Sequence, residues 1–126
     1  MKYAVDKKEQ FVVFTIMEEK LDSTLSPQLK SELLTVHAEG YKNLILDMGS
    51  VKYADSSGLS ALLVGNRAFN EIGGVFVLSS LQEHVVKLLK ISMLDKVFKV
   101  VDDNEAAAEA IFIHEIESGA EKDEEE

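Results

Sequence analysis

Two continuous apolar runs limit the folds open to this chain of 126 residues more than any other feature. Residues 43–48 read NLILDM and residues 75–78 read VFVL, and neither run alternates polar with apolar side chains. Strands of this kind are buried on both faces, which is typical of a sheet with helices packed against it. Between the two runs, residues 58–72 place apolar side chains at helical spacing, namely Leu59, Leu62, Leu63, Phe69 and Ile72. The pattern therefore predicts a strand, a helix and a second strand.

The N-terminal part of the chain continues this alternation. Residues 3–8 and 11–17 are predicted strands joined by a short turn, and the second is rich in β-branched and aromatic residues. Ser26 and Pro27 predict a helix start, with Ser26 as the N-cap and Pro27 at the first helical position. Gly40 predicts the end of that helix, because glycine readily adopts the left-handed conformation found there.

The C-terminal part completes the predicted order ββαβαβαβα. Ser80-Leu81-Gln82-Glu83 fits a capping box that opens a further helix. A short strand over residues 97–101 precedes a final helix over residues 103–116. Residues 117–126 have little apolar content, and we expect a disordered acidic tail there. The predicted organisation is one α/β domain over residues 1–116 followed by this tail.

The composition argues against several kinds of site. The chain has no cysteine, so disulfides are excluded and a zinc site would lack its commonest soft ligands. The net charge is −10, and residues 115–126 contribute seven acids and one lysine to it. Arg67 is the only arginine. Because nucleic-acid binding relies on a basic surface, we expect no direct nucleic-acid partner.

Targeting signals are also lacking in the sequence. The N-terminus has no apolar segment of the kind that a secretory signal needs. No apolar run approaches the roughly 18 residues that span a bilayer, so we expect no membrane insertion. The expected location is the cytoplasm.

The loop before the helix over residues 58–72 is the candidate functional segment. Ser56 and Ser57 lie there, between the buried strand 43–48 and the helix. Serine hydroxyls at such a position can cap the helix, and the helix start favours added negative charge. A phosphate on either serine would meet outward-pointing backbone N–H groups. The loop is thus suited to a phosphorylation switch, although on these residues alone the simpler interpretation is that both hydroxyls only cap the helix.

The same segment resembles the STAS domain of the anti-sigma factor antagonist family. Asp55-Ser56-Ser57-Gly58-Leu59 matches that family's D-S-[ST]-G-L segment. Leu21-Asp22-Ser23-Thr24 is similar to the family's L-D-x-x-T/S turn before the first helix. Gly73-Gly74 and the stretch over residues 85–98 also fit, and the resemblance extends from Val12 to about Ala110.

The resemblance implies a fold and a function. The expected fold is a single STAS domain with a mixed sheet of about five strands and helices packed mainly on one side. The expected function is that of an anti-sigma factor antagonist, which binds a serine-kinase anti-sigma factor when unphosphorylated and is released on phosphorylation. Ser56 is the implied phosphoacceptor and Ser57 the second choice. A separate phosphatase would remove the phosphate.

The resemblance also implies a partner surface around the same loop. The expected contact residues are Asp22, Ser23, Thr24, Tyr53, Asp55, Ser56, Ser57, Gly58 and Leu59. In this interpretation the protein is a substrate and not an enzyme, and it carries no catalytic residues, metal or cofactor. The ATP belongs to the partner kinase.

Three other interpretations remain open from the sequence. A STAS domain can be an adaptor subunit of a transport or signalling assembly, without phosphorylation. Ser56 could be the nucleophile of a small hydrolase, but His37, His84 and His114 each lie on a predicted helix without a recognisable partner set. Asp22 could serve only to stabilise its turn. The oligomeric state is not readable, although the predicted edge strand 3–8 could pair with a second chain.

Overall fold

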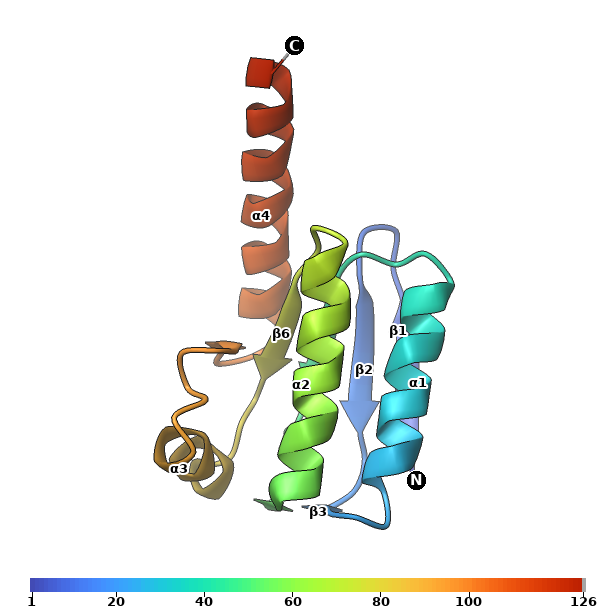
Figure 1. Ribbon diagram of the computed structural model, residues 1–126, viewed down its shortest axis with the longest axis vertical. Helices are drawn as coiled ribbons and strands as arrows, with labels where there is room; N and C mark the ends of the chain where they lie inside the picture. The colour runs from blue at the N-terminus through green and yellow to red at the C-terminus, as the bar shows by residue number, and fades with distance from the viewer. Residues whose placement is uncertain (126) are drawn as a thin grey trace.

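The computed structural model describes the backbone of residues 1–125 and the side chains of residues 1–119. A mixed five-stranded sheet forms its centre, in the order β1-β2-β4-β6-β7 (Figure 1). Only β1 is antiparallel to its neighbour, and the other pairs are parallel. The predicted mixed sheet of five strands is confirmed. The strands are β1 Tyr3–Lys7, β2 Val12–Ile16, β4 Leu44–Asp47, β6 Phe76–Ser79 and β7 Lys99–Val101.

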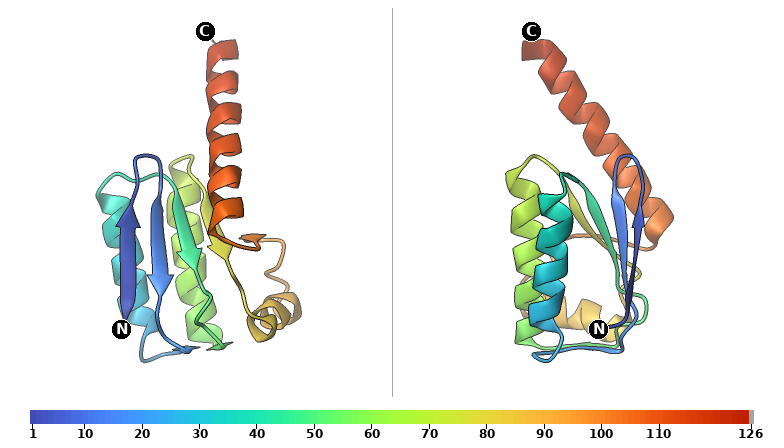
Figure 2. Two further views of the ribbon diagram at one scale, coloured as in Figure 1. Left: turned by 180° about the vertical axis from the view of Figure 1, so that it is seen from behind. Right: turned by 90° about the vertical axis from the view of Figure 1, so that its right-hand side faces the viewer.

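Four helices cover the sheet unequally. The helices are α1 Ser26–Ala38, α2 Ser56–Glu71, α3 Glu83–Ile91 and α4 Asn104–Glu125. The first two lie side by side on one face, and α4 lies on the opposite face (Figure 2). The larger core fills the space under α1 and α2 and includes residues of α3. The smaller core joins β4 and β6 to α4, through Ile45, Val75, Val77, Ala107 and Ile111.

The two apolar runs form the interior of the sheet, as predicted. In β4, Leu44, Ile45 and Leu46 are fully buried, and alternate side chains belong to the larger and the smaller core. All four residues of β6 are buried as well. Both strands have a parallel neighbour on each side, which leaves neither backbone edge exposed.

A second, very small sheet was not predicted. The strands β3 Lys20–Leu21 and β5 Tyr53–Ala54 pair in parallel at one end of the molecule. Each has two residues, which is too short for a period-2 pattern to show in the sequence. This pair matters for function because it ties the turn before α1 to the loop before α2.

The predicted helix starts need three corrections. Ser56 and Ser57 are not in a loop before a helix that starts at residue 58, because α2 itself begins at Ser56. Ser26 is not the N-cap of α1 but its first helical residue, and its hydroxyl donates to the backbone oxygen of Asp22 at 2.7 Å. The capping box at residues 80–83 is also wrong. Ser80 has a φ of +60°, and α3 starts at Glu83 without a side-chain cap. Gly40 ends α1 as predicted, with a φ of +101°.

The last helix is longer than predicted. Asp103 lies just before it, and its carboxylate accepts from the amide of Ala106 at 2.8 Å. The helix then continues through Glu125, so residues 117–125 are helical where we expected disorder. Glu126 lies outside the described residues. The division into a domain over residues 1–116 and a tail over residues 117–126 stays a prediction.

Candidate functional site

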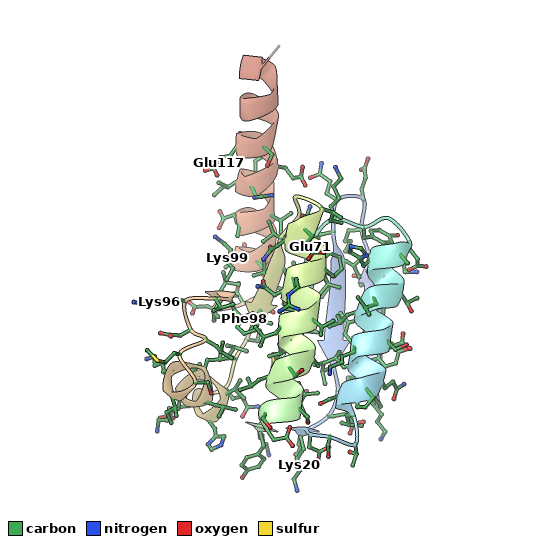
Figure 3. The ribbon with its side chains drawn as sticks, in the orientation of Figure 1. Lys20, Glu71, Lys96, Phe98, Lys99 and Glu117 are labelled. Atoms are coloured by element: carbon green, nitrogen blue, oxygen red, sulfur yellow. The ribbon has the colours of Figure 1, made fainter. Side chains whose placement is uncertain are left out.

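The paired strands β3 and β5 bring the two predicted loop segments together. Leu21 pairs with Ala54, and the amide of Asp55 donates to the Leu21 oxygen at 3.2 Å. The backbone oxygen of Glu19 accepts from Lys52 at 2.7 Å. Figure 3 labels Lys20 at this end of the molecule, where α2 begins. Residues of both predicted segments, far apart in sequence, therefore share one surface.

The start of α2 lies so close to the backbone of β3 that position 58 must be a glycine. Gly58 is buried, and a Cβ at its position would lie 2.5 Å from the Leu21 backbone oxygen. That distance is shorter than any real Cβ contact, and the obstacle is backbone that cannot rotate away. The glycine of the D-S-S-G segment thus lets α2 begin directly against β3.

Asp55 is the cap of α2. Its Oδ1 accepts from the Gly58 amide at 3.0 Å and from the Ser57 hydroxyl at 2.5 Å. The hydrogen bond from Ser57 and then that from Gly58 hold the pKa of the Asp55 carboxyl below its usual range. The carboxylate therefore stays charged at the positive end of the helix. Asp55, and neither of the two serines, is therefore the residue that caps α2.

Ser57 faces the interior of the site. Besides donating to Asp55, its Oγ lies 3.2 Å from the Oγ of Ser26, which is only 1% exposed. Ser26 in turn donates to the Asp22 backbone oxygen. A chain of hydroxyl contacts thus connects the start of α2 to the start of α1. Ser26 was not predicted as a site residue, because it is 31 positions from Ser57 in the sequence.

Ser56 faces outward instead. It is the first residue of α2 and is exposed. Among the side chains of residues 1–119, none forms a hydrogen bond with the Ser56 hydroxyl. Backbone N–H groups of the first helical turn lack helical partners and create a positive potential there. A phosphate on the Ser56 side chain would lie close to this positive potential. Two neighbouring serines therefore have different environments.

Asp22 directly follows β3, on the turn before α1. Its Oδ1 accepts from the amide and the hydroxyl of Thr24, at 3.0 and 2.6 Å. These two bonds hold the pKa of the Asp22 carboxyl below its usual range, although the nearby Asp55 charge opposes the shift. The turn-stabilising role is thus confirmed, and the residue also lies close enough to Asp55 to feel its charge. Ser23 and Thr24 are exposed on the same turn.

Two residues that sequence reasoning missed, Lys20 and His84, lie beside the expected contact residue Tyr53. Tyr53 is 52% exposed, and its ring meets the edge of the His84 ring of α3 at a centroid distance of 5.2 Å. A pocket of about 360 Å³ lies beside it, lined by Lys20, Leu21, Asp22, Tyr53, Ala54 and Asp55. Lys20 and His84 gave no motif signal, because they come from a two-residue strand and from a separate helix.

Two of the expected contact residues lie in the interior. Leu59 is 7% exposed and belongs to the larger core, and Gly58 is buried against Leu21. Both residues support the exposed segment from the interior. Their prediction as surface contact residues is therefore wrong. The exposed members of the set are Ser23, Thr24, Tyr53, Asp55 and Ser56.

The three histidines do not form a catalytic set with Ser56. His37 lies on α1 and packs edge-on against Phe69, and His84 contacts Tyr53. His114 lies on α4 and contacts the Gly73 backbone oxygen at 2.9 Å. Within the described residues, no cluster of three or more His, Cys, Asp or Glu side chains could hold a metal ion. In the same part of the chain, no helix is both long and apolar enough to cross a membrane.

Comparison with known proteins identifies the family. The family model described as the STAS domain matches residues 2–108. The chain belongs to the STAS domain family. A relative from Bordetella bronchiseptica, BtrV, is provisionally named an anti-sigma factor antagonist. It is 30% identical over 110 residues, which cover 87% of this STAS chain and 94% of BtrV.

Solved STAS structures share the fold. The anti-sigma factor antagonist SpoIIAA of Bacillus has been solved in unphosphorylated and phosphorylated forms, each with a TM-score of 0.67. The phosphorylated form is 19% identical and aligns over 86% of this chain and 99% of its own. A sulfate transporter family protein from Wolinella succinogenes has a TM-score of 0.71 at 20% identity, over 86% of this chain and 88% of its own.

Proposed function

We propose that this STAS protein is an anti-sigma factor antagonist that works as a phosphorylation switch. With Ser56 unmodified, it binds a serine-kinase anti-sigma factor through the surface around Ser56. A phosphate on Ser56 releases it, and a phosphatase restores the binding form. One observation carries the proposal: Ser56 is exposed with no hydrogen-bond partner among the described side chains, while Ser57 beside it is engaged by Asp55 and Ser26.

In the proposed phosphoryl transfer from ATP to Ser56, this protein supplies only the acceptor hydroxyl. The Ser56 Oγ attacks the γ-phosphorus of ATP held by the kinase, the bond to ADP breaks, and the hydroxyl proton passes to a base of the kinase. This chain supplies a hydroxyl at a fixed place, because Asp55 and Gly58 hold the helix start beneath it. It is the substrate of the reaction and supplies no catalytic group.

The effect of the phosphate follows from the local charges. It adds about −1.5 to −2 charges beside the ionised Asp55 and Asp22. The N-terminus of α2 offsets part of this charge within the protein. A docked kinase surface that matches the unmodified site would face both repulsion and the cost of burying the phosphate. Local electrostatics are enough to release the partner, so no refolding is required.

A second candidate function rests on one of the comparisons. The Wolinella succinogenes neighbour belongs to a sulfate transporter family, so the same fold occurs in that setting. An adaptor of this kind would bind its partner whatever the state of Ser56. The BtrV relative, with its higher identity and near-complete coverage, favours the antagonist over the adaptor.

The test is a capture experiment from lysates of the source organism. The baits are the native protein, Ser56→Ala, Ser56→Asp and Ser31→Asp, where Ser31 is an exposed serine of α1 that controls for added charge. We expect Ser56→Ala and Ser31→Asp to recover a kinase-like anti-sigma factor and Ser56→Asp to recover far less. If all four baits recover the same partner equally, the switch is refuted and the adaptor role is supported.

A further inference from the structure

The helix α4 has apolar side chains on two opposite sides. Ala107 and Ile111 are buried against the sheet. On the other side, Phe112, Ile113 and Ile116 are 58%, 53% and 54% exposed. At about 3.6 residues per turn these three side chains fall within roughly 100° of arc, so they form one surface, the α4 stripe. Exposed apolar side chains that gather on one surface often mark a site of interaction with another molecule.

The surroundings of the α4 stripe are strongly acidic. Residues 103–126 contain ten acids and one lysine, a net charge of −9, whereas residues 1–102 contain thirteen acids and twelve bases, a net charge of −1. Glu105 and Glu109 are exposed on the helix one and two turns before the stripe. Acidic residues 121 and 123–126 follow it in the sequence. Nearly the whole net charge of the protein is thus concentrated in residues 103–126, the part of the sequence that also carries the exposed apolar residues.

This combination selects the kind of partner. We infer that the α4 stripe docks a basic amphipathic segment of another protein, whose apolar side covers Phe112, Ile113 and Ile116 and whose Lys or Arg residues meet the flanking acids. A second copy of α4, which holds eight acids and one lysine, would bring a charge of −7 against −7, and an anionic lipid surface would be repelled in the same way. Charge complementarity therefore favours a basic protein segment.

The position of the α4 stripe separates it from the Ser56 site. The helix projects beyond the sheet at the end of the molecule opposite the start of α2 (Figure 1). The stripe also begins after Ala108, where the match to the STAS domain ends. A segment bound to α4 can therefore stay attached while the Ser56 surface binds or releases its own partner. The inference does not depend on the proposed function.

A synthetic probe tests the inference directly. The probe is an 18-residue peptide of leucine and lysine in amphipathic helical order, and the reference is the same composition in scrambled order. Binding to the full chain is measured by fluorescence anisotropy in low salt and in about 0.3 M salt, where screening weakens exposed charge pairs. We expect the ordered peptide to bind at least about tenfold more tightly than the scrambled one, and more weakly in high salt.

Matched variants locate the binding. Phe112→Ser with Ile116→Ser should remove the preference for the ordered peptide. Ile91→Ser with Met17→Ser, which replaces residues that are 80% and 49% exposed outside α4, should keep it. Glu105→Gln with Glu109→Gln should weaken binding of both peptides. Circular dichroism confirms that each variant is folded.

Several results would overturn the inference. Equal affinity for the ordered and scrambled peptides would mean that charge alone drives binding. An unchanged preference in the Phe112→Ser, Ile116→Ser variant would place the peptide elsewhere. Sedimentation showing a dimer that this variant abolishes, or binding to phosphatidylglycerol vesicles, would assign the stripe to a second copy or to a membrane instead.

Discussion

The segment from Tyr53 to Gly58, here called the Ser56 segment, has an outer and an inner side. The two sides differ in exposure and in hydrogen bonding. On the outer side, Ser56 is exposed and Tyr53 is 52% exposed. On the inner side, Ser57 is hydrogen-bonded to Asp55, and Gly58 is pressed against the Leu21 backbone. Adjacent serines thus have separate tasks. The inner residues fix the start of α2, and this rigidity holds the outer hydroxyl at one place on the surface.

The difference also explains why two neighbouring hydroxyls are not equivalent phosphate acceptors. The Ser57 proton already binds the Asp55 carboxylate, and its oxygen approaches the buried Ser26. A phosphate at Ser57 would have to displace these contacts, whereas a phosphate at Ser56 displaces none of the described ones. The loop therefore favours modification on its outer side.

The largest loss of stability is expected when a side-chain carbon is added at Gly58. In Gly58→Ala, the new Cβ would meet the Leu21 backbone oxygen at 2.5 Å, so α2 and β3 must separate. We expect a loss of about 3 kcal/mol in the free energy of unfolding, measured by urea denaturation. Gly119→Ala is the control, because a Cβ there meets nothing within 4 Å. Equal stability of the two variants would contradict the close approach.

The next effect concerns the outer side alone. Tyr53→Ala removes a half-exposed aromatic ring whose closest aromatic contact is the His84 ring. Exposed tyrosines at the centre of an interface often contribute much of the affinity. We expect affinity for the kinase captured by Ser56→Ala to fall about tenfold, by surface plasmon resonance, with little change in unfolding. Met93→Ala, at an 82% exposed residue outside the loop, should leave the affinity unchanged.

The two serines themselves give a smaller but sharper contrast in stability. Ser57→Ala removes the hydroxyl that donates to the Asp55 carboxylate, and a typical hydrogen bond contributes on the order of 1 kcal/mol. Ser56→Ala removes a hydroxyl without a described partner, so its change should stay within about 0.5 kcal/mol. Thermal unfolding of both variants provides the comparison. A greater loss for Ser56→Ala would reverse the assignment of inner and outer sides.

The smallest expected effect is a dependence of stability on pH. The folded-state pKa values of Asp22 and Asp55 lie below the ordinary value of 3.8. Their contribution to stability is therefore present above about that pH and is lost as the pH falls through the lower folded values. We expect Asp22→Asn with Asp55→Asn to be less stable at pH 7 and to lose less stability between pH 5 and pH 2. Parallel pH curves for the native and double-variant proteins would disprove this coupling.

Local patterns in the sequence were sufficient for most of the fold. The apolar runs at residues 43–48 and 75–78 predicted β4 and β6, because burial on both faces leaves a strong signal. The apolar spacing over residues 58–72 predicted α2, which begins two residues earlier than expected, at Ser56. In each case the structural cause lies within a few neighbouring residues.

The features that sequence reasoning missed depend on distant contacts. The strands β3 and β5 are stabilised by each other and have no signal of their own. Ser26 was interpreted as a cap because of Pro27, but its hydroxyl instead joins Asp22 to Ser57. The burial of Leu59 likewise follows from the way α2 packs on the sheet. The length of α4 was underestimated, because a run of acidic residues is also typical of disorder.

The most direct test of the account is to locate the phosphate. The native protein, Ser56→Ala and Ser57→Ala are each incubated with ATP and the kinase captured by the Ser56→Ala bait, and modified fragments are mapped by mass spectrometry. The account predicts phosphate on Ser56 in the native protein and in Ser57→Ala, and none in Ser56→Ala. Phosphate on Ser57 in the native protein, or modification of the Ser56→Ala variant, would contradict it.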